Sequence, residues 1–168
     1  MEGVAISRAG PERIGELEPL WKALHAHHGS VAGHLAAIAP FRSPDDSWER
    51  RRAHYERVLA GADSFLLLAE RDRRPVAYAL IGIGGTEASL VVGERVAELD
   101  SLSVLPGERS RGLGTLLLDA VDEELRRLGI AELSLAVMAG NDGAARLYER
   151  RGFVPYVTVM LGRVPPSE

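Results

Sequence analysis

The segment from Gly112 to Gly129 constrains the fold most, because it is the clearest amphipathic helix in the chain and β-type runs flank it on both sides. Its leucines and valine recur at helical spacing, two arginines occupy its last turn, and Gly129 ends it. The runs 96–104 and 131–138, before and after it, are each predicted to form a strand. A strand, helix and strand of these lengths normally make a right-handed parallel crossover, so the sequence predicts an α/β (α+β) fold.

The remaining elements are predicted to complete a mixed sheet with helices on its faces. From spacing, capping residues and turn residues they are a strand at 4–7, a helix opened by Pro11, a helix from Ser43 to Gly61, two hairpin strands at 64–70 and 75–85, a helix at 141–152 and a final strand within 153–164. No repeat, linker or low-complexity tract separates them, and 168 residues are the size of one ordinary domain. Residues 1–168 are therefore predicted to form a single domain.

Composition excludes several classes of function. The formal net charge of −4 provides no basic surface for nucleic acid or an anionic membrane, and the absence of cysteine excludes a cysteinyl acyl-enzyme. The N-terminal residues lack a basic start followed by an apolar run, and the longest clearly apolar run, 65–69, is too short to cross a bilayer. We therefore expect a cytoplasmic protein whose partners include neither nucleic acid nor a membrane.

The sequence RSRGLG at 109–114, at the entrance to the central helix, has the composition of an anion site. A helix that starts in a glycine turn presents unpaired backbone N–H groups and the positive end of its dipole. Gly112 and Gly114 remove Cβ atoms that would block a ligand, while Arg109 and Arg111 add charge. A Walker loop needs Gly-Lys-Ser/Thr and a dinucleotide fingerprint needs a third glycine, and this loop has neither. A pyrophosphate site and a plain tight turn with solvated arginines both remain open.

Two motifs together resemble the GNAT superfamily of N-acetyltransferases. RSRGLG is similar to the family's Arg/Gln-x-x-Gly-x-Gly/Ala signature, and NDGAARLYERRGF at 141–153 is similar to its second signature, in the family's order. The resemblance covers 96–160 closely and the N-terminal half in outline. It implies a GNAT fold with a central mixed, mostly antiparallel sheet, flanking helices and strands splayed at an acetyl-CoA site.

The resemblance further implies that acetyl-CoA is the acyl donor. Its pyrophosphate would lie on the backbone amides of 111–115, and its pantetheine arm would follow the strand that ends at Val104. A plain N-cap explains Asn141 as well as a contact with that arm does. The residues that the resemblance assigns to acetyl-CoA are Leu102, Ser103, Val104, Arg109, Ser110, Arg111, Gly112, Leu113, Gly114, Thr115, Asn141, Ala144 and Tyr148.

Transfer to an amine needs a base, because an alkyl ammonium with a pKa of roughly 10.4 must lose a proton before it attacks a thioester. In a regular strand, Glu98 and Asp100 point to the same side as Leu102 and Val104, and each carboxylate matches the base of one branch of the family. The alternative is that both are ordinary solvent-facing carboxylates without a catalytic role. A β-bulge in the strand would also change which side each of them points to. Tyr148 occupies the position of the family's general acid, and the alternative is that it is an aromatic residue of the core.

The acceptor side has no motif of its own. In the family the first two helices cover the acceptor, which makes Trp21, His28 and Phe41 candidate substrate residues, although a core role also explains Trp21. The histidines between 25 and 34 lack the spacing and carboxylate partners of a metal site, so no metal is predicted.

The predicted function is therefore acetyl transfer from acetyl-CoA to a primary amine of a small molecule or protein, by direct attack in a ternary complex. Small amines, aminoglycoside-like antibiotics, amino acids and protein amines all remain candidate acceptors. Two alternatives are a non-catalytic acyl-CoA-binding sensor or partner module and a nucleotide-binding regulatory domain. Members of the family are often homodimers, so a second copy of the chain is a further candidate partner.

Overall fold

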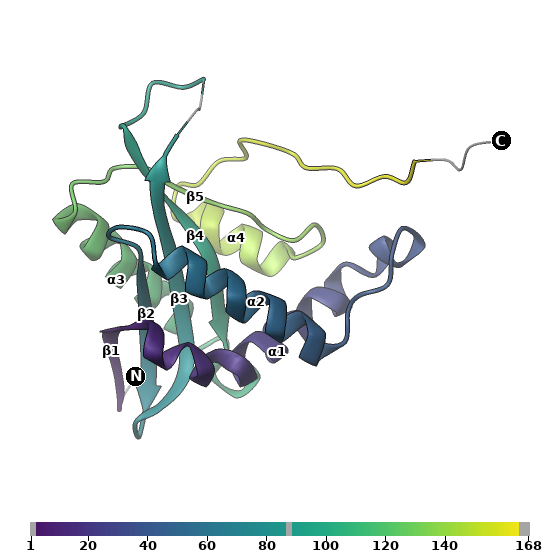
Figure 1. Ribbon diagram of the computed structural model, residues 1–168, viewed down its shortest axis with the longest axis horizontal. Coiled ribbons are helices and arrows are strands. Elements are labelled where there is room, and N and C mark those ends of the chain that lie inside the picture. Colours follow the sequence, from purple (N-terminus) through teal and green to yellow (C-terminus); the bar gives the residue numbers. More distant parts are fainter. Residues whose placement is uncertain (1–2, 87–88, 165–168) are drawn as a thin grey trace.

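A computed structural model describes residues 3–86 and 89–164, and its centre is a five-stranded sheet (Figure 1). The strands are β1 (Val4–Ala9), β2 (Phe65–Arg71), β3 (Arg74–Gly85), β4 (Arg95–Val104) and β5 (Leu133–Leu135). They lie in the order β1-β2-β3-β4-β5, with antiparallel neighbours from β1 to β4 and a parallel pair of β4 and β5. The predicted mixed, mostly antiparallel sheet is confirmed, and the parallel pair is the crossover expected around the central helix.

Helices cover both faces of this sheet (Figure 1). They are the 3₁₀ helices η1 (Pro11–Leu17), η2 (Gly33–Ala37) and η3 (Pro106–Glu108) and the α-helices α1 (Glu18–Val31), α2 (Pro44–Leu59), α3 (Leu113–Arg127) and α4 (Asp142–Arg150). The helix opened by Pro11 thus begins as a 3₁₀ helix and becomes α-helical only at Glu18. Ser43 caps α2 as predicted, since its Oγ accepts a hydrogen bond from the backbone N of Asp46 at 3.2 Å.

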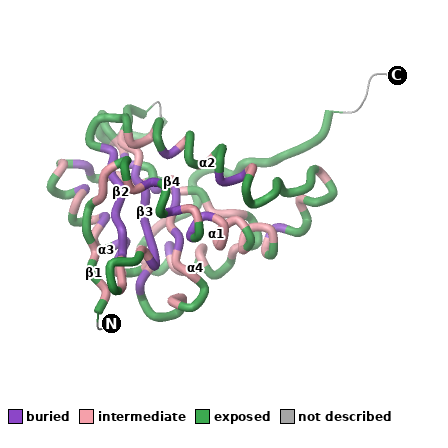
Figure 2. The backbone as a smooth tube through the Cα atoms, turned by 60° about the horizontal axis from the view of Figure 1, so that its bottom comes forward, coloured by how far each residue is buried: buried purple, intermediate pink, exposed green. Residues whose placement is uncertain are grey.

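An apolar core fills each face. Trp21 of α1 and Tyr55 of α2 belong to one core, and Leu117 and Val121 of α3 belong to the other. Residues of β2 point alternately into the two cores and are buried from Phe65 to Ala69, as Figure 2 shows for β2 and β3. A strand buried on both faces has no polar side, which explains the continuous apolar run in its sequence.

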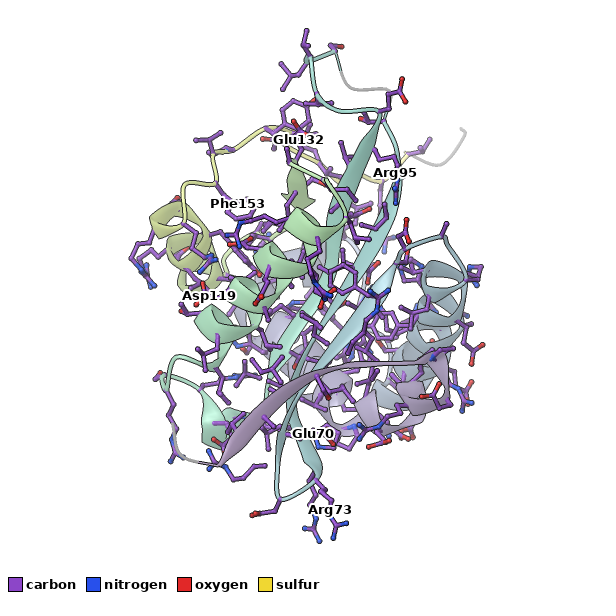
Figure 3. All side chains as sticks on the ribbon, turned by 90° about the vertical axis from the view of Figure 1, so that its left-hand side faces the viewer. Glu70, Arg73, Arg95, Asp119, Glu132 and Phe153 are labelled. Carbon is purple, nitrogen blue, oxygen red and sulfur yellow. The ribbon has the colours of Figure 1, made fainter. Side chains whose placement is uncertain are left out.

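The helix α4 packs beside α3 on the same face of the sheet. Arg151, which follows α4, donates to Asp119 at 2.7 Å and to Asp122 at 2.5 Å, and Figure 3 shows Asp119 on the side of α3 that faces α4. These two ion pairs fix the direction in which the chain leaves α4.

A β-bulge at Asp100 corrects the expectation of a regular pleat in β4. Leu80 lies opposite Ser101 while Ile81 lies opposite Leu99, so Asp100 is an extra residue. Leu102 and Val104 therefore pack into the α3 core and do not share a face with Asp100, whose side chain contacts α2. The bulge sends the strand's polar side chains and its later apolar side chains to opposite faces.

The strands β4 and β5 are splayed, as predicted. Pairing is restricted to residues 97–99 of β4 with 133–135 of β5, although the sequence predicted a strand over the whole of 131–138. Beyond Leu99, the edge of β4 that faces β5 has no strand partner among the described residues. This gap leaves backbone N–H and C=O groups of β4 available for another molecule.

The prediction of a final strand within 153–164 is wrong, because the structure has no strand in the described residues after α4. The segment is extended and runs away from the sheet (Figure 1). Its large apolar side chains are exposed, among them Val159 and Val164. A strand needs a neighbouring strand for its backbone groups, and none of the described strands pairs with this segment, whose Arg163 instead donates from Nε to the backbone O of Ile38 at 2.7 Å. No helix within residues 3–86 and 89–164 combines the length and the apolar character that crossing a membrane requires.

Candidate active site

The entrance to α3 carries a row of backbone donors. Gly112, with φ of 78°, is the N-cap residue in the left-handed conformation and no side chain caps the helix. The first helical bond at this end runs from the N of Leu116 to the O of Gly112. In the described part of the chain, the backbone N–H groups from Ser110 to Thr115 have no acceptor. Together with the positive end of the helix dipole, such donors can bind an anion.

The two arginines of this loop have different roles. Arg109 donates from its Nε to the backbone O of Val104 at 3.0 Å, so it anchors the loop to the end of β4. Arg111 is exposed, with Nη1 3.5 Å from the Oε2 of Glu108. Glu108 is held mainly by Arg71 in a two-pronged pair, and those hydrogen bonds lower the pKa of its carboxyl. Arg111 is therefore the loop guanidinium that is free to meet a bound anion.

A cavity of about 620 Å³ lies in front of this entrance, in the gap beyond the paired part of β4. All the residues predicted for acetyl-CoA line it except Arg111 and Tyr148. Sequence reasoning missed a wall made by α1, although the spacing of Leu24, His27 and Val31 places them on one helix face. We call this space the donor cavity.

Gly140 closes the donor cavity where α1 meets the turn before α4. Its φ is +91°, and a Cβ at this position would lie 2.3 Å from the backbone O of Val31. Next to it, Asn141 caps α4, since its Oδ1 accepts from the N of Ala144 at 3.3 Å and lies 3.4 Å from the Nε2 of His27. The capping role of Asn141 is thus confirmed, and only its side-chain nitrogen is left for a ligand.

Tyr148 lies under the donor cavity rather than in its wall. Its side chain is buried in the α3 core, and its ring meets that of Phe153 edge-on at 5.7 Å between centroids. Burial raises the pKa of Tyr148 to about 12, so the phenol is neutral at ordinary pH. The hydroxyl has no hydrogen-bond partner among the described residues, whereas every fully buried polar side-chain atom in them has one. The hydroxyl is therefore not fully buried. It keeps some contact with solvent and can donate a hydrogen bond.

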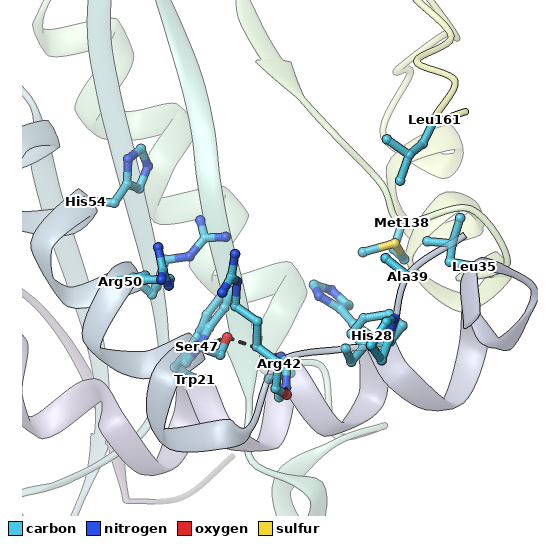
Figure 4. A pocket seen from close by; sticks show the side chains of 14 residues that line it. Trp21, His28, Leu35, Ala39, Arg42, Ser47, Arg50, His54, Met138 and Leu161 are labelled. Atoms are coloured by element: carbon cyan, nitrogen blue, oxygen red, sulfur yellow. Dashed lines mark hydrogen bonds between the residues drawn. The ribbon is translucent and has the colours of Figure 1, made fainter. Parts of the chain in front are cut away.

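A second cavity, of about 560 Å³, lies between α1, α2 and the loop that joins them (Figure 4). The three predicted substrate residues, Trp21, His28 and Phe41, all line it. Trp21 is also a core residue, and its Nε1 donates to the Oγ of Ser47 at 3.1 Å. Burial, together with nearby positive groups, lowers the pKa of His28 to about 4 and keeps it neutral. We call this space the acceptor pocket.

Of the two predicted base residues, Asp100 is held in a network and Glu98 is not. His54 of α2, which lines the acceptor pocket, hydrogen-bonds through Nε2 to Asp100, and Arg51 donates to the same carboxylate at 3.3 Å. Ser101 adds a bond at 3.1 Å. Glu98 is exposed and lies opposite Gly82, where a side chain would face α2, so both carboxylates are on the α2 side. Sequence analysis missed His54, whose only local signal is its place three residues after Arg51 on one face of α2.

The acceptor pocket and the donor cavity share no lining residue, but neighbouring residues of α1 line both, His28 the first and His27 the second. Asp100 touches the acceptor pocket through His54, and Leu102 lines the donor cavity. Met138, which follows β5, lines the acceptor pocket from the other side of the gap. Within the described residues, no group of three or more His, Asp or Glu side chains could hold a metal ion.

The sequence model of the acetyltransferase (GNAT) family matches residues 29–153. The chain belongs to this family. It is 34% identical over 152 residues to a mycothiol acetyltransferase of Propionibacterium freudenreichii, which is 90% of this chain and 43% of that protein. It is 42% identical over 57 residues to the ribosomal protein bS18 alanine N-acetyltransferase of Escherichia coli, which is 34% of this chain and 38% of that protein. The chain spans less than half the length of these curated relatives in each match.

A solved GNAT structure confirms the predicted fold. The aminoglycoside N-acetyltransferase AAC(6')-Iy, in complex with CoA, matches with a TM-score of 0.70 and 20% identity over 96% of this chain and 94% of that chain. The identity is low, so this likeness concerns the arrangement of strands and helices. It agrees with the splayed sheet and its flanking helices.

Proposed function

We propose that this chain is an acetyl-CoA-dependent N-acetyltransferase that moves the acetyl group to a primary amine by direct attack in a ternary complex. The proposal depends on the donor cavity. Unpaired amides at the entrance to α3 and the open edge of β4 both line this cavity, and the acceptor pocket lies next to it on the other side of α1. Membership of the GNAT family supports the same reaction.

The donor would bind through main-chain groups. The amides of residues 111–115 would hold the pyrophosphate, and the exposed guanidinium of Arg111 would add charge. The pantetheine arm would pair with β4 from Leu102 to Val104, where the gap leaves the edge of the strand open. Asn141 and Ala144 would contact the arm from α4.

The base of the proposed reaction is one of the two β4 carboxylates, and the contacts favour Asp100 acting through His54. Asp100 accepts the hydrogen from Nε2 of His54, which leaves Nδ1 as the basic atom of the imidazole. Nδ1 would take a proton from the ammonium, directly or through water. Glu98, exposed on the same side of β4, is the alternative base through water.

The transfer then breaks one bond and forms one. The amine nitrogen forms a C–N bond with the thioester carbon while the C–S bond breaks. Tyr148 would donate its proton to the departing sulfur, and the proton lost by the nitrogen would return to Tyr148 through solvent. The neutral state of this phenol supports the role of acid.

The test compares ligand stabilisation with turnover. A ligand at 100 times its Kd stabilises the folded state by about 2.7 kcal/mol, so acetyl-CoA should raise the melting temperature by several degrees and ATP should not. A panel of amines should then release free CoA thiol. Stabilisation by acetyl-CoA with no thiol release from any amine would favour a non-catalytic acyl-CoA-binding module instead, and stronger stabilisation by ATP would favour a nucleotide-binding regulatory domain.

We also propose that two copies associate through the segment that follows α4. The exposed apolar side chains in this segment are Val154, Tyr156, Val157, Val159, Met160, Leu161 and Val164. The outer edge of β5 ends the sheet and has no neighbour among the described strands. An extended apolar segment and a free sheet edge in one chain can pair with the same elements of a second copy across a two-fold axis. Sedimentation should give a dimer that replacing Val157 and Val159 by Asp dissociates; a monomer at micromolar concentration would contradict the pairing.

A further inference from the structure

Six basic side chains line the acceptor pocket beside its apolar residues, and none of the described residues that line it is a carboxylate. Among its lining residues are three arginines, Arg42, Arg50 and Arg51, and three histidines, His25, His28 and His54. Figure 4 shows Arg42, Arg50 and His54 along the wall made by α2 and the loop before it, with His28 and Met138 across the pocket. The distribution differs from that of the whole chain, whose net charge is −4.

The carboxylates near these arginines do not neutralise them. Asp46 accepts from both Arg42, at 2.9 Å, and Arg50, at 3.0 Å, so one negative charge serves two guanidiniums. Asp100 is shared between Arg51 and His54. Each guanidinium has five N–H donors, and Arg42 and Arg50 each use one in these pairs. Donors of both remain to bind an anion that enters the pocket.

Each of the three guanidiniums has a contact that orients it. The guanidinium carbon of Arg51 lies 4.1 Å from the ring centroid of Trp21 and 5.7 Å from that of Tyr55. Arg42 and Arg50 are joined through Asp46 at the first turns of α2. His54, the proposed proton acceptor, projects from the same helix as Arg50, one turn farther along. An acceptor bound at the arginines would thus keep its amine within reach of His54 only if the anion and the amine belong to one compact molecule or one chain end.

We propose that the acceptor of this site is a primary amine that carries an anionic group, a carboxylate or a phosphate, which Arg42 and Arg50 bind, and that polycationic amines are rejected. The inference rests on the proposed acetyl transfer and names its substrate class. It separates this chain from the aminoglycoside class of acceptor, which is polycationic. The lowered pKa of His28, to which Arg51 and two other histidines contribute, agrees with a pocket that disfavours further positive charge.

The experiment measures kcat/KM for acceptor pairs that differ only in the anionic group. Suitable pairs are β-alanine with β-alaninamide, glutamate with glutamine, and phosphoethanolamine with ethanolamine, with spermidine and kanamycin as polycations. We expect the anionic member of at least one pair to be favoured tenfold or more, and the carboxylate and phosphate pairs identify the anion. Equal rates within all pairs, or the highest kcat/KM for a polycation, would overturn the proposal while leaving acetyl transfer intact.

Three variants connect this preference to the pocket. Arg42→Gln and Arg50→Gln should raise KM for the anionic acceptor about tenfold each with little change in kcat, and should reduce the preference over the neutral partner. Arg52→Gln is the matched control, because Arg52 lies on the same helix, pairs with Glu56 at 3.2 Å and does not line the pocket. An unchanged preference in both pocket variants would contradict the assignment.

A binding measurement distinguishes failure of the anionic ligand class from failure of the proposed acetyl transfer. Calorimetric titration of the CoA-loaded protein with the anionic amines needs no turnover. Binding that Arg42→Gln and Arg50→Gln weaken, without thiol release from any amine, would support the anionic ligand class and refute the transferase. Thiol release together with no difference in binding between anionic and neutral amines would refute the ligand class alone.

Discussion

Replacing Gly140 by alanine tests how the donor cavity is closed. The backbone at Gly140 has φ of +91°, which side-chain-bearing residues rarely adopt, and the new Cβ would lie 2.3 Å from the backbone O of Val31. The strained backbone costs about 1–3 kcal/mol and relief of the overlap a further 1–3 kcal/mol, because the contacted atom is main chain and cannot rotate away. The expected loss in the free energy of unfolding is about 2–6 kcal/mol, or roughly 4–24 °C in melting temperature for a chain of this size.

The same substitution should weaken acetyl-CoA binding, because the overlap pushes the end of α1 away from the start of α4. Val31 and Asn141 both line the donor cavity at this contact, so we expect the Kd for acetyl-CoA to rise at least tenfold. Gly143→Ala is the control. It lies in the first turn of α4 and lines the same cavity, but its Cβ would be 3.9 Å from the nearest atom outside its own helix backbone and neighbours, so helix propensity predicts a gain of about 0.5–1 kcal/mol.

Urea unfolding monitored by circular dichroism and calorimetric titration with acetyl-CoA give the two quantities. If Gly140→Ala is as stable as the parent chain and binds acetyl-CoA equally well, the close contact between α1 and α4 does not shape the cavity. A loss of stability with unchanged affinity would show that the contact supports the fold alone.

Three further predictions concern the proposed chemistry. His54→Gln should lower kcat by about 10²-fold or more through loss of the base, whereas Glu98→Gln should lower it only a few-fold, and the reverse order in steady-state kinetics would make Glu98 the base. Tyr148→Phe should lower kcat about tenfold or more with a change in stability under about 1 kcal/mol, since the hydroxyl has no hydrogen-bond partner among the described residues; an unchanged kcat would remove Tyr148 as the acid. Burial lowers the pKa of His28 from its ordinary value of 6.5 to about 4 in the folded chain, so the unfolded chain binds the extra proton first and stability should fall as pH drops from 6.5 to 4. Urea titrations at pH 7 and pH 4.5 measure how much free energy of unfolding each protein loses between the two pH values. After allowance for solvent screening, we expect this loss to be about 1–2 kcal/mol smaller in His28→Gln than in the parent chain. Identical losses in the two proteins would contradict the lowered pKa of His28.

Sequence analysis succeeded where the signal is local. The helix α3 is fixed by a single apolar stripe, which places Leu117, Val121 and Leu125 in the core, and Gly129 with φ of +69° ends it as expected. The glycine turn at its entrance, with Gly112 in the left-handed conformation, follows from the same stretch of chain. Capping by Ser43 and Asn141 is also local, since each bonds to a backbone N three residues later.

Features that depend on distant partners were missed. The bulge at Asp100 exists only because β4 is paired with β3, and no property of residues 96–104 alone specifies which residue is extra. His54 meets Asp100 across 46 positions of sequence, through the packing of α2 on the sheet. The segment 153–164 has the apolar residues of a strand, but residues form a strand only beside another strand, so its local preference predicted a structure that this chain alone does not make.

Total charge and local charge lead to different conclusions about ligands. A net charge of −4 argues against binding an extended polyanion, because such a partner contacts a large surface and interacts with the average charge of that surface. A small anion contacts a few groups at short range, and beyond a Debye length of about 8–10 Å the other charges are screened. Three arginines in one pocket with two nearby carboxylates therefore decide what enters it, whatever the sign of the whole chain. Raising the ionic strength should weaken binding of an anionic amine to the acceptor pocket without changing which member of each pair binds more tightly.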